Sequence, residues 1–121
     1  MRELTSHKVN GLNEALAIKV LDEPGSGNAC HRYAIAPTTG NAIGIVIDFQ
    51  NGPLQETIHP NGVSNEALLA VVEDRLLGFQ SGEYSCRENA VALTKLQECM
   101  MWLQKRTRDR IARGVEGTSQ K

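Results

Sequence analysis

The sequence of 121 residues lacks the features that define membrane, secreted and metal-binding proteins. Its longest uncharged apolar run, residues 42–47, is far too short to cross a bilayer. No apolar signal region follows residues 1–4, so secretion is not expected and a cytoplasmic protein is the expectation. Cys30, Cys86 and Cys99 form no CxxC pair, which argues against a disulfide framework and a structural zinc site.

Patterns typical of catalysis are also missing. No Gly-rich stretch ends in Gly-Lys-Ser/Thr, so residues 25–27 indicate a turn and not a phosphate-binding loop. The histidines are scattered: His7, His31 and His59. They have neither metal-ligand spacing nor the His-x-Ser/Thr pattern of a phosphoesterase that cuts cyclic nucleotides. We therefore expect no catalytic residue, no metal and no cofactor.

Positive charge is concentrated near the C-terminal end of the sequence. Residues 104–121 contain six Lys/Arg and two Asp/Glu, whereas residues 1–103 contain seven Lys/Arg and twelve Asp/Glu. An acidic body with a basic end indicates either an anionic partner at that end or self-association between unlike surfaces.

The first half of the chain predicts short strands. Residues 16–20 alternate as in a half-buried strand, and residues 31–36 and 42–49 predict a hairpin closed by the turn 37–41. Residues 55–59 are a candidate edge strand. The side chains expected to face the core from the second hairpin strand are Ile43, Ile45, Ile47 and Phe49. The prediction is an antiparallel sheet of four or five strands.

The second half predicts two helices. Ser64 is a suitable N-cap, and an apolar stripe follows at Leu68, Val72, Leu76 and Phe79. Residues 85–88 form a Ser-x-x-Glu capping box that would start a second helix. The stripe of that helix is Asn89, Leu93, Leu96, Met100 and Leu103. A short Gly-containing link makes the pair an antiparallel helical hairpin.

The expected fold is therefore α+β in a single domain: a small N-terminal sheet (1–62), a long helical hairpin (63–114) and a C-terminal tail (115–121). A helix over 86–113 would be about 42 Å long, which exceeds the diameter of about 35 Å expected for a compact chain of this length. The overhang would expose the apolar residues 100–103 in a monomer, so we expect a homo-oligomer, either dimer or hexamer.

The basic cluster 105–110 is the sharpest local feature. Arg106, Arg110 and Arg113 recur at i, i+4 and i+7, and they continue the line of Leu103 instead of opposing it. Guanidinium groups in this position suit a bidentate grip on phosphate or carboxylate. The alternative is a basic helix end that offsets the helix dipole and pairs with acids nearby.

Two residues nearer the helix link have a similar ambiguity. Phe79 is either a core aromatic or a ring on which a base could stack. Asn89 lies on the core-facing stripe, where its amide needs partners, from either the loop or a ligand.

Four motifs occur in order along the second half: Phe49-Gln50-Asn51-Gly52-Pro53, Gly78-Phe79-Gln80-Ser81-Gly82, Cys86-Arg87-Glu88-Asn89-Ala90, and a stretch from Trp102 to Thr118. With these motifs the chain resembles the phage anti-Thoeris sponge proteins, the Thoeris anti-defence family. The hairpin half also resembles the anti-CBASS cyclic-nucleotide sponges. The resemblance covers about residues 45–118.

The resemblance implies binding without catalysis. Members of this family sequester glycocyclic ADP-ribose, the signal made by the Thoeris TIR protein, and some also bind cyclic trinucleotides of CBASS defence. By motif, Phe79 would stack on the adenine, Asn89 would bond the base or ribose, and Arg106 and Arg110 would grip the phosphates. Asp109 would orient an arginine or bond a ribose hydroxyl, and Arg87 is a weaker candidate.

Other functions stay open from the sequence. The chain could be a sponge for CBASS cyclic oligonucleotides only, or a hairpin module that oligomerises without a ligand. Binding of a nucleic-acid polymer needs a broader positive face than this mostly acidic chain provides, and neither that polymer nor a membrane is an expected partner. A hydrolase of the same signals is disfavoured because catalytic residues are missing.

Overall fold

A computed structural model describes all residues, 1–121, and divides the chain into two compact units. The sheet unit comprises Met1–Pro53 and Thr57–Val63, and the hairpin unit comprises Leu54–Glu56 and Ser64–Lys121. Each unit is described by itself. No helix of the chain combines the length and apolarity that a membrane span requires.

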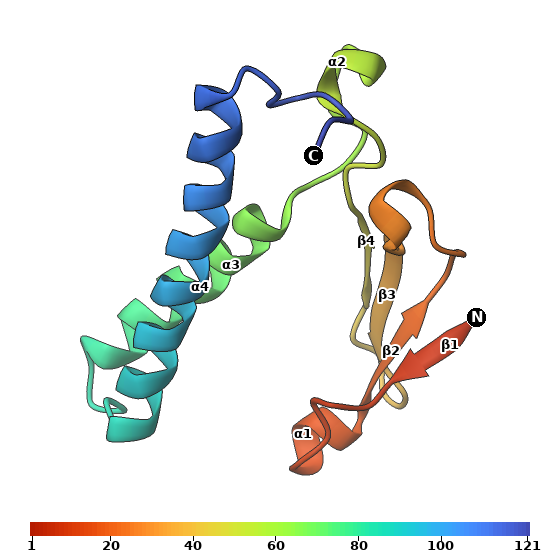
Figure 1. Cartoon of the computed structure of the whole chain (residues 1–121). Helices are drawn as coiled ribbons and strands as arrows, with labels where there is room; N and C mark the ends of the chain where they lie inside the picture. The colour runs from red at the N-terminus through yellow and green to blue at the C-terminus, as the bar shows by residue number, and fades with distance from the viewer. The chain divides into compact units, whose positions relative to one another are not determined.

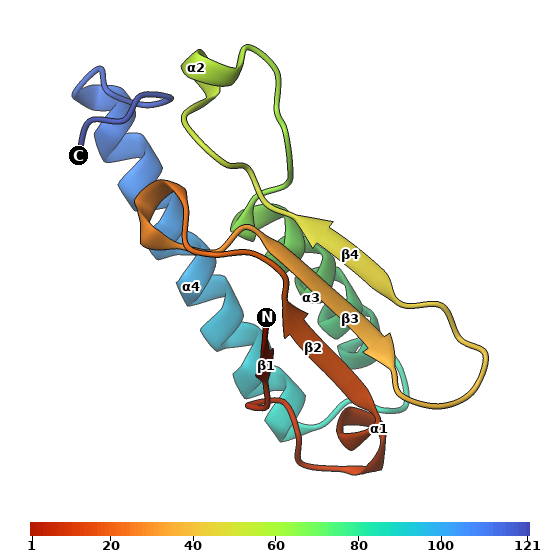
Figure 2. The same cartoon turned by 90° about the vertical axis from the view of Figure 1, so that its right-hand side faces the viewer.

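The sheet unit contains four antiparallel strands in the order β1-β2-β3-β4 (Figure 2). The strands are β1 (Arg2–Leu4), β2 (Leu16–Val20), β3 (Arg32–Pro37) and β4 (Ile45–Asp48). Val20 pairs with Tyr33, and Tyr33 pairs with Ile47, which fixes the register across three strands. The predicted sheet and its hairpin are confirmed.

The sheet unit has a small core at one end of β2. Val20 is almost fully buried, and Cys30 and His31 are buried as well. Phe49 is half-buried and meets the Tyr33 ring edge-on at 5.6 Å between centroids. The prediction that Ile43 and Ile45 face this core is wrong, because Ile43 precedes β4 and is 94% exposed, while Ile45 at the strand start is also exposed.

Three short elements connect the strands to each other and to the hairpin unit. They are α1 (Gly11–Glu14), the 3-10 turn η1 (Ser26–Asn28) and α2 (Leu54–Thr57). The edge strand predicted at 55–59 is wrong, since most of that segment lies in α2. Gln55 and Glu56 are good helix formers, and Pro53 before them suits a helix start.

The hairpin unit contains α3 (Asn65–Gln80) packed against α4 (Arg87–Ala112), as Figure 1 shows. The Ser64 side chain accepts a hydrogen bond from the Ala67 N–H at 3.0 Å, which confirms the predicted cap. The capping box at 85–88 is wrong by one residue: Cys86 is the N-cap, and its sulfur accepts the Asn89 N–H at 3.4 Å.

The inward face of α4 follows the predicted stripe. The half-buried positions of α4 up to residue 107 are Asn89, Leu93, Leu96, Met100, Leu103 and Thr107. The predicted stripe of α3 is wrong in part, because Val72 and Phe79 are exposed. The less exposed line on α3 instead contains Leu69, Glu73, Leu76 and Gln80, which recur at i, i+4, i+7 and i+11.

Candidate anion-binding site

The last turns of α4 and the chain end border an open hollow of about 430 Å³, which we call the basic hollow. Its lining residues are Trp102, Lys105, Arg106, Asp109, Arg110 and Arg113 from α4, and Lys121. Five of these seven side chains are cationic and one is a carboxylate, so the hollow attracts anions. The structure thus brings together three predicted site residues: Arg106, Asp109 and Arg110.

Arg106 is the arginine of the basic hollow that is not bonded within its own chain. Its side chain is exposed and forms no hydrogen bond or ion pair within the chain. Asp109, one turn further along, accepts a hydrogen bond from Lys105 Nζ at 2.7 Å. A free guanidinium offers five N–H donors in a planar fork, the geometry that matches phosphate.

Arg110 is in the opposite state, because it is only 6% exposed and bonded to its own chain. Its Nη2 donates to the carbonyls of Val115 at 2.8 Å and Thr118 at 3.1 Å, and its Nη1 donates to the Gln120 carbonyl. Its Nε lies 3.3 Å from the Glu116 carboxylate. Arg110 therefore binds residues 115–120 to the helix end and retains one N–H for another partner.

The far end of the hairpin unit holds Phe79, which is 44% exposed near the end of α3. The Arg75 guanidinium lies over its ring, 5.7 Å from the centroid. Together with Gly78 they border a shallow hollow. A half-exposed ring beside a cation is suited to stacking with a base that carries phosphates nearby.

Asn89 and Arg87 lie in the first turn of α4, after the loop 81–86. That loop is closed without them: Gln80 accepts the Cys86 N–H at 3.1 Å and donates to the Cys86 carbonyl at 3.2 Å. The Asn89 amide side chain forms no hydrogen bond in its own chain, and Arg87 is exposed without an ion pair. The structure therefore does not show the Asn89 amide bonded to the loop, and the interpretation in which it bonds a ligand stays open.

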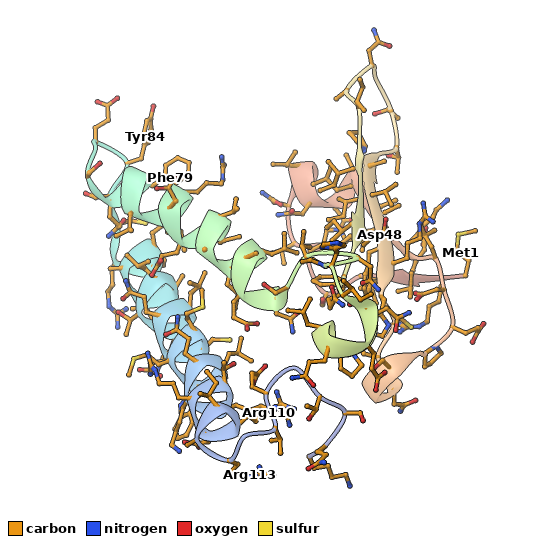
Figure 3. The ribbon with its side chains drawn as sticks, turned by 90° about the horizontal axis from the view of Figure 1, so that it is seen from above. Met1, Asp48, Phe79, Tyr84, Arg110 and Arg113 are labelled. Atoms are coloured by element: carbon orange, nitrogen blue, oxygen red, sulfur yellow. The ribbon has the colours of Figure 1, made fainter.

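The predicted residues fall into two groups at opposite ends of α4. Figure 3 shows Phe79 near the loop between the helices, and Arg110 with Arg113 near the other end. Seventeen residues separate Asn89 from Arg106, which corresponds to about 25 Å along a helix axis. A single chain does not bring Phe79, Arg87 and Asn89 to the basic hollow.

Sequence reasoning missed some residues at both ends. Lys121 lines the basic hollow, and Arg75 stands over Phe79. Lys105 and Arg113 also line the hollow, and both belong to the basic stretch that the sequence had already singled out. The i, i+4 spacing of Arg75 and Phe79 could have revealed their contact, because such residues are neighbours on a helix. The position of Lys121 depends on how the tail folds back, which no periodicity encodes. No group of three or more His, Cys, Asp or Glu side chains is arranged to hold a metal.

A family model described as the Acb2/Tad1 hairpin domain matches residues 41–108, more than half of the chain. The chain belongs to the Acb2/Tad1 hairpin domain family. The range matched to the Acb2/Tad1 hairpin domain includes Phe79, Arg87, Asn89 and Arg106, and it ends just before Asp109 and Arg110.

A curated phage protein supports the same family. The chain is 56% identical over 75 residues to "Thoeris anti-defense 1" of Bacillus phage SBSphiJ7. The aligned part is 62% of this chain and 52% of the phage protein, so the chain spans about half of that relative's length. The family resemblance seen in the sequence motifs is confirmed.

Proposed function

We propose that this chain sequesters glycocyclic ADP-ribose, the signal nucleotide of Thoeris defence, and releases it unchanged. The observation that carries the proposal is the basic hollow, where the uncommitted Arg106 guanidinium faces a concave, positively charged surface. Membership of the Acb2/Tad1 hairpin family and the relative named as an anti-defence protein support the same function.

Within the basic hollow the three predicted residues take different roles. Arg106 binds a phosphate directly with its free donors. Arg110 adds its charge and one remaining N–H while it holds the tail in place. Asp109 orients Lys105, to which it is already paired, or accepts a ribose hydroxyl.

The second group supplies recognition of the base. Phe79 stacks on the adenine, Asn89 bonds the base or ribose with its unpaired amide, and Arg87 adds charge at the rim. Because about 25 Å separates this group from Arg106, the ligand is shared between two copies of the chain. In a pair with antiparallel α4 helices, the loop end of one copy meets the basic hollow of the other.

Exposed apolar side chains on the hairpin unit support this self-association. On α3 and α4 they include Val71, Val72, Leu77, Val91, Met101 and Ile111, all at least 45% exposed. Burial of these side chains in a contact between copies would remove apolar area from water, which favours association.

The expected affinity suits a sponge. A cyclic ADP-ribose isomer has about 35 non-hydrogen atoms, and about 0.3 kcal/mol per atom gives roughly 11 kcal/mol of binding free energy. This corresponds to a Kd of about 10 nM.

The test is calorimetric titration with glycocyclic ADP-ribose, followed by chromatography of the ligand released by heating the complex. We expect tight binding and recovery of unaltered ligand. Recovery of a cleaved product would replace the sponge with a hydrolase. A parallel titration with cyclic tri-adenylate measures binding of the CBASS-type ligand, and heat from that ligand alone would overturn the Thoeris assignment.

A further inference from the structure

We infer that Trp102 is a base-stacking residue of the basic hollow and takes the face of the adenine opposite the one that stacks on Phe79 of the other copy, so that the hollow recognises the base as well as the phosphates. The inference rests on the proposed function, because it assigns a further binding residue to the same site. Trp102 lines the hollow together with Arg106 and Asp109.

The position of Trp102 on α4 places it beside the cations. Lys105, Arg106 and Asp109 follow it by three, four and seven residues, so all of them lie on one side of the helix. The core-facing residues are Leu103, which directly follows Trp102, and Thr107, which directly follows Arg106. The indole therefore belongs to the face that lines the hollow and not to the face that packs on α3.

The indole is uncommitted in its own chain. It is 70% exposed, its N–H donates no hydrogen bond, and neither of the ring interactions in the chain includes it. A large aromatic surface left open next to a cluster of cations is the combination that binds nucleotides, with stacking on the ring and phosphates on the cations.

Most charged groups around the hollow are bonded within the chain, but the Arg106 guanidinium next to Trp102 is not. Lys105 is paired with Asp109, Arg110 holds residues 115–120, and Arg113 donates to the Lys121 carbonyl. Arg106, one turn after Trp102, is the arginine of the hollow without an internal partner. A base on the indole would place the attached phosphate near this guanidinium.

The first experiment uses tryptophan fluorescence, because Trp102 is the only tryptophan in the chain. Glycocyclic ADP-ribose should quench the emission with the same midpoint as its calorimetric titration. Pyrophosphate, which carries charge but no base, should leave the emission unchanged when it competes at the hollow. Calorimetric binding of glycocyclic ADP-ribose with no change in emission would overturn the role of Trp102 and leave the proposed function standing.

Variants give a second, independent readout. Trp102→Leu should weaken binding by about 5- to 150-fold, the range expected for the loss of one stacking contact, whereas Trp102→Tyr should keep most of it. Gln104→Ala is the matched control, since Gln104 is exposed on the same helix but does not line this hollow. Equal binding by Trp102→Leu and wild type would contradict the inference.

Light scattering on the same variants separates stacking from assembly. Trp102→Leu should keep the wild-type mass. A fall in mass, with the binding loss explained by dissociation, would assign the indole to the contact between copies and overturn the stacking role. No heat from the wild-type protein would instead contradict the proposed function itself.

Discussion

Both ends of α4 carry polar side chains, but different residues are bonded within the chain at each end. At the loop end, Gln80 closes the turn through both backbone groups of Cys86, while Phe79 and the Asn89 amide remain available. At the other end, Arg110 holds the tail, while Arg106 remains available. Each end thus has one residue that maintains structure and neighbours that are free to bind: a ring and an amide at the loop end, and a guanidinium at the other end.

This comparison teaches that residue type and spacing do not assign a role. Arg106 and Arg110 are one turn apart and have identical side chains, but one is exposed and the other is 6% exposed. The difference comes from the tail carbonyls, which satisfy the Arg110 donors. The following substitutions separate the binding residues from the structural ones, beginning with the largest expected effect.

Asn89→Trp should abolish ligand binding, with a loss of at least a thousandfold, or about 4 kcal/mol. The bulky indole would fill the space that the proposed base or ribose needs. Calorimetry measures the loss, and circular dichroism checks that the helices persist. Phe79→Ala is a milder companion, expected to cost about 1–3 kcal/mol of stacking. Wild-type affinity in both variants would remove the loop end from the site.

Arg106→Ala should weaken binding by about 2–5 kcal/mol, because a desolvated phosphate would lose its charged partner. The free energy of unfolding should change by less than about 0.5 kcal/mol, since the exposed side chain has no internal bond. Arg108→Ala is the control, because Arg108 is also exposed but does not line the basic hollow. Equal affinity losses in the two variants would indicate a diffuse charge effect.

Arg110→Ala should lower the free energy of unfolding of the hairpin unit by about 2–4 kcal/mol. The carbonyls of Val115 and Thr118 and the Glu116 carboxylate would lose their shared donor. Urea denaturation measures the change, and faster hydrogen exchange at the Thr118 amide would locate it in the tail. Unchanged exchange there would show that the tail does not depend on Arg110.

Gln80→Ala should have the smallest effect, a destabilisation of about 1–2 kcal/mol from two lost hydrogen bonds. Gln97→Ala, at an exposed position of α4, is the control and should be neutral or slightly stabilising because alanine favours helix. Ligand affinity in Gln80→Ala should fall only as far as the loop loosens. A loss as large as that of Arg106→Ala would make Gln80 a binding residue.

The sequence predicted most elements of both units but not every face. Alternation at residues 16–20 and the periodic stripe from Asn89 to Leu103 were sufficient to predict a strand and the inward face of a helix, because each pattern has one clear apolar side. On α3 the apolar residues extend around the helix, with Leu68, Leu69, Val71 and Val72 in one stretch. Such a stretch gives no unique phase, so the predicted stripe was partly wrong.

The remaining differences depend on local bonds and on distant chain segments. Cys86 replaced the expected hydroxyl cap because its sulfur accepts the Asn89 N–H. The segment 54–57 is helical where the sequence predicted a strand, and its Gln55 N–H donates to the Gly117 carbonyl, some 60 residues away in the sequence. The burial of Arg110 likewise depends on the fold of the tail, which helix periodicity does not describe.

Sharing of one ligand between two copies is the central claim, and mixing two inactive variants tests it most directly. Asn89→Trp and Arg106→Glu chains, carrying different tags, would be co-expressed, and the mixed pair would be purified through both tags. In a two-fold symmetric pair, one site of the mixed species combines both defects and the other combines two intact ends. We predict that glycocyclic ADP-ribose binds the mixed pair with wild-type affinity at about half the wild-type stoichiometry, while each pure variant fails to bind. Absence of binding by the mixed pair, with wild type binding normally, would contradict the shared site.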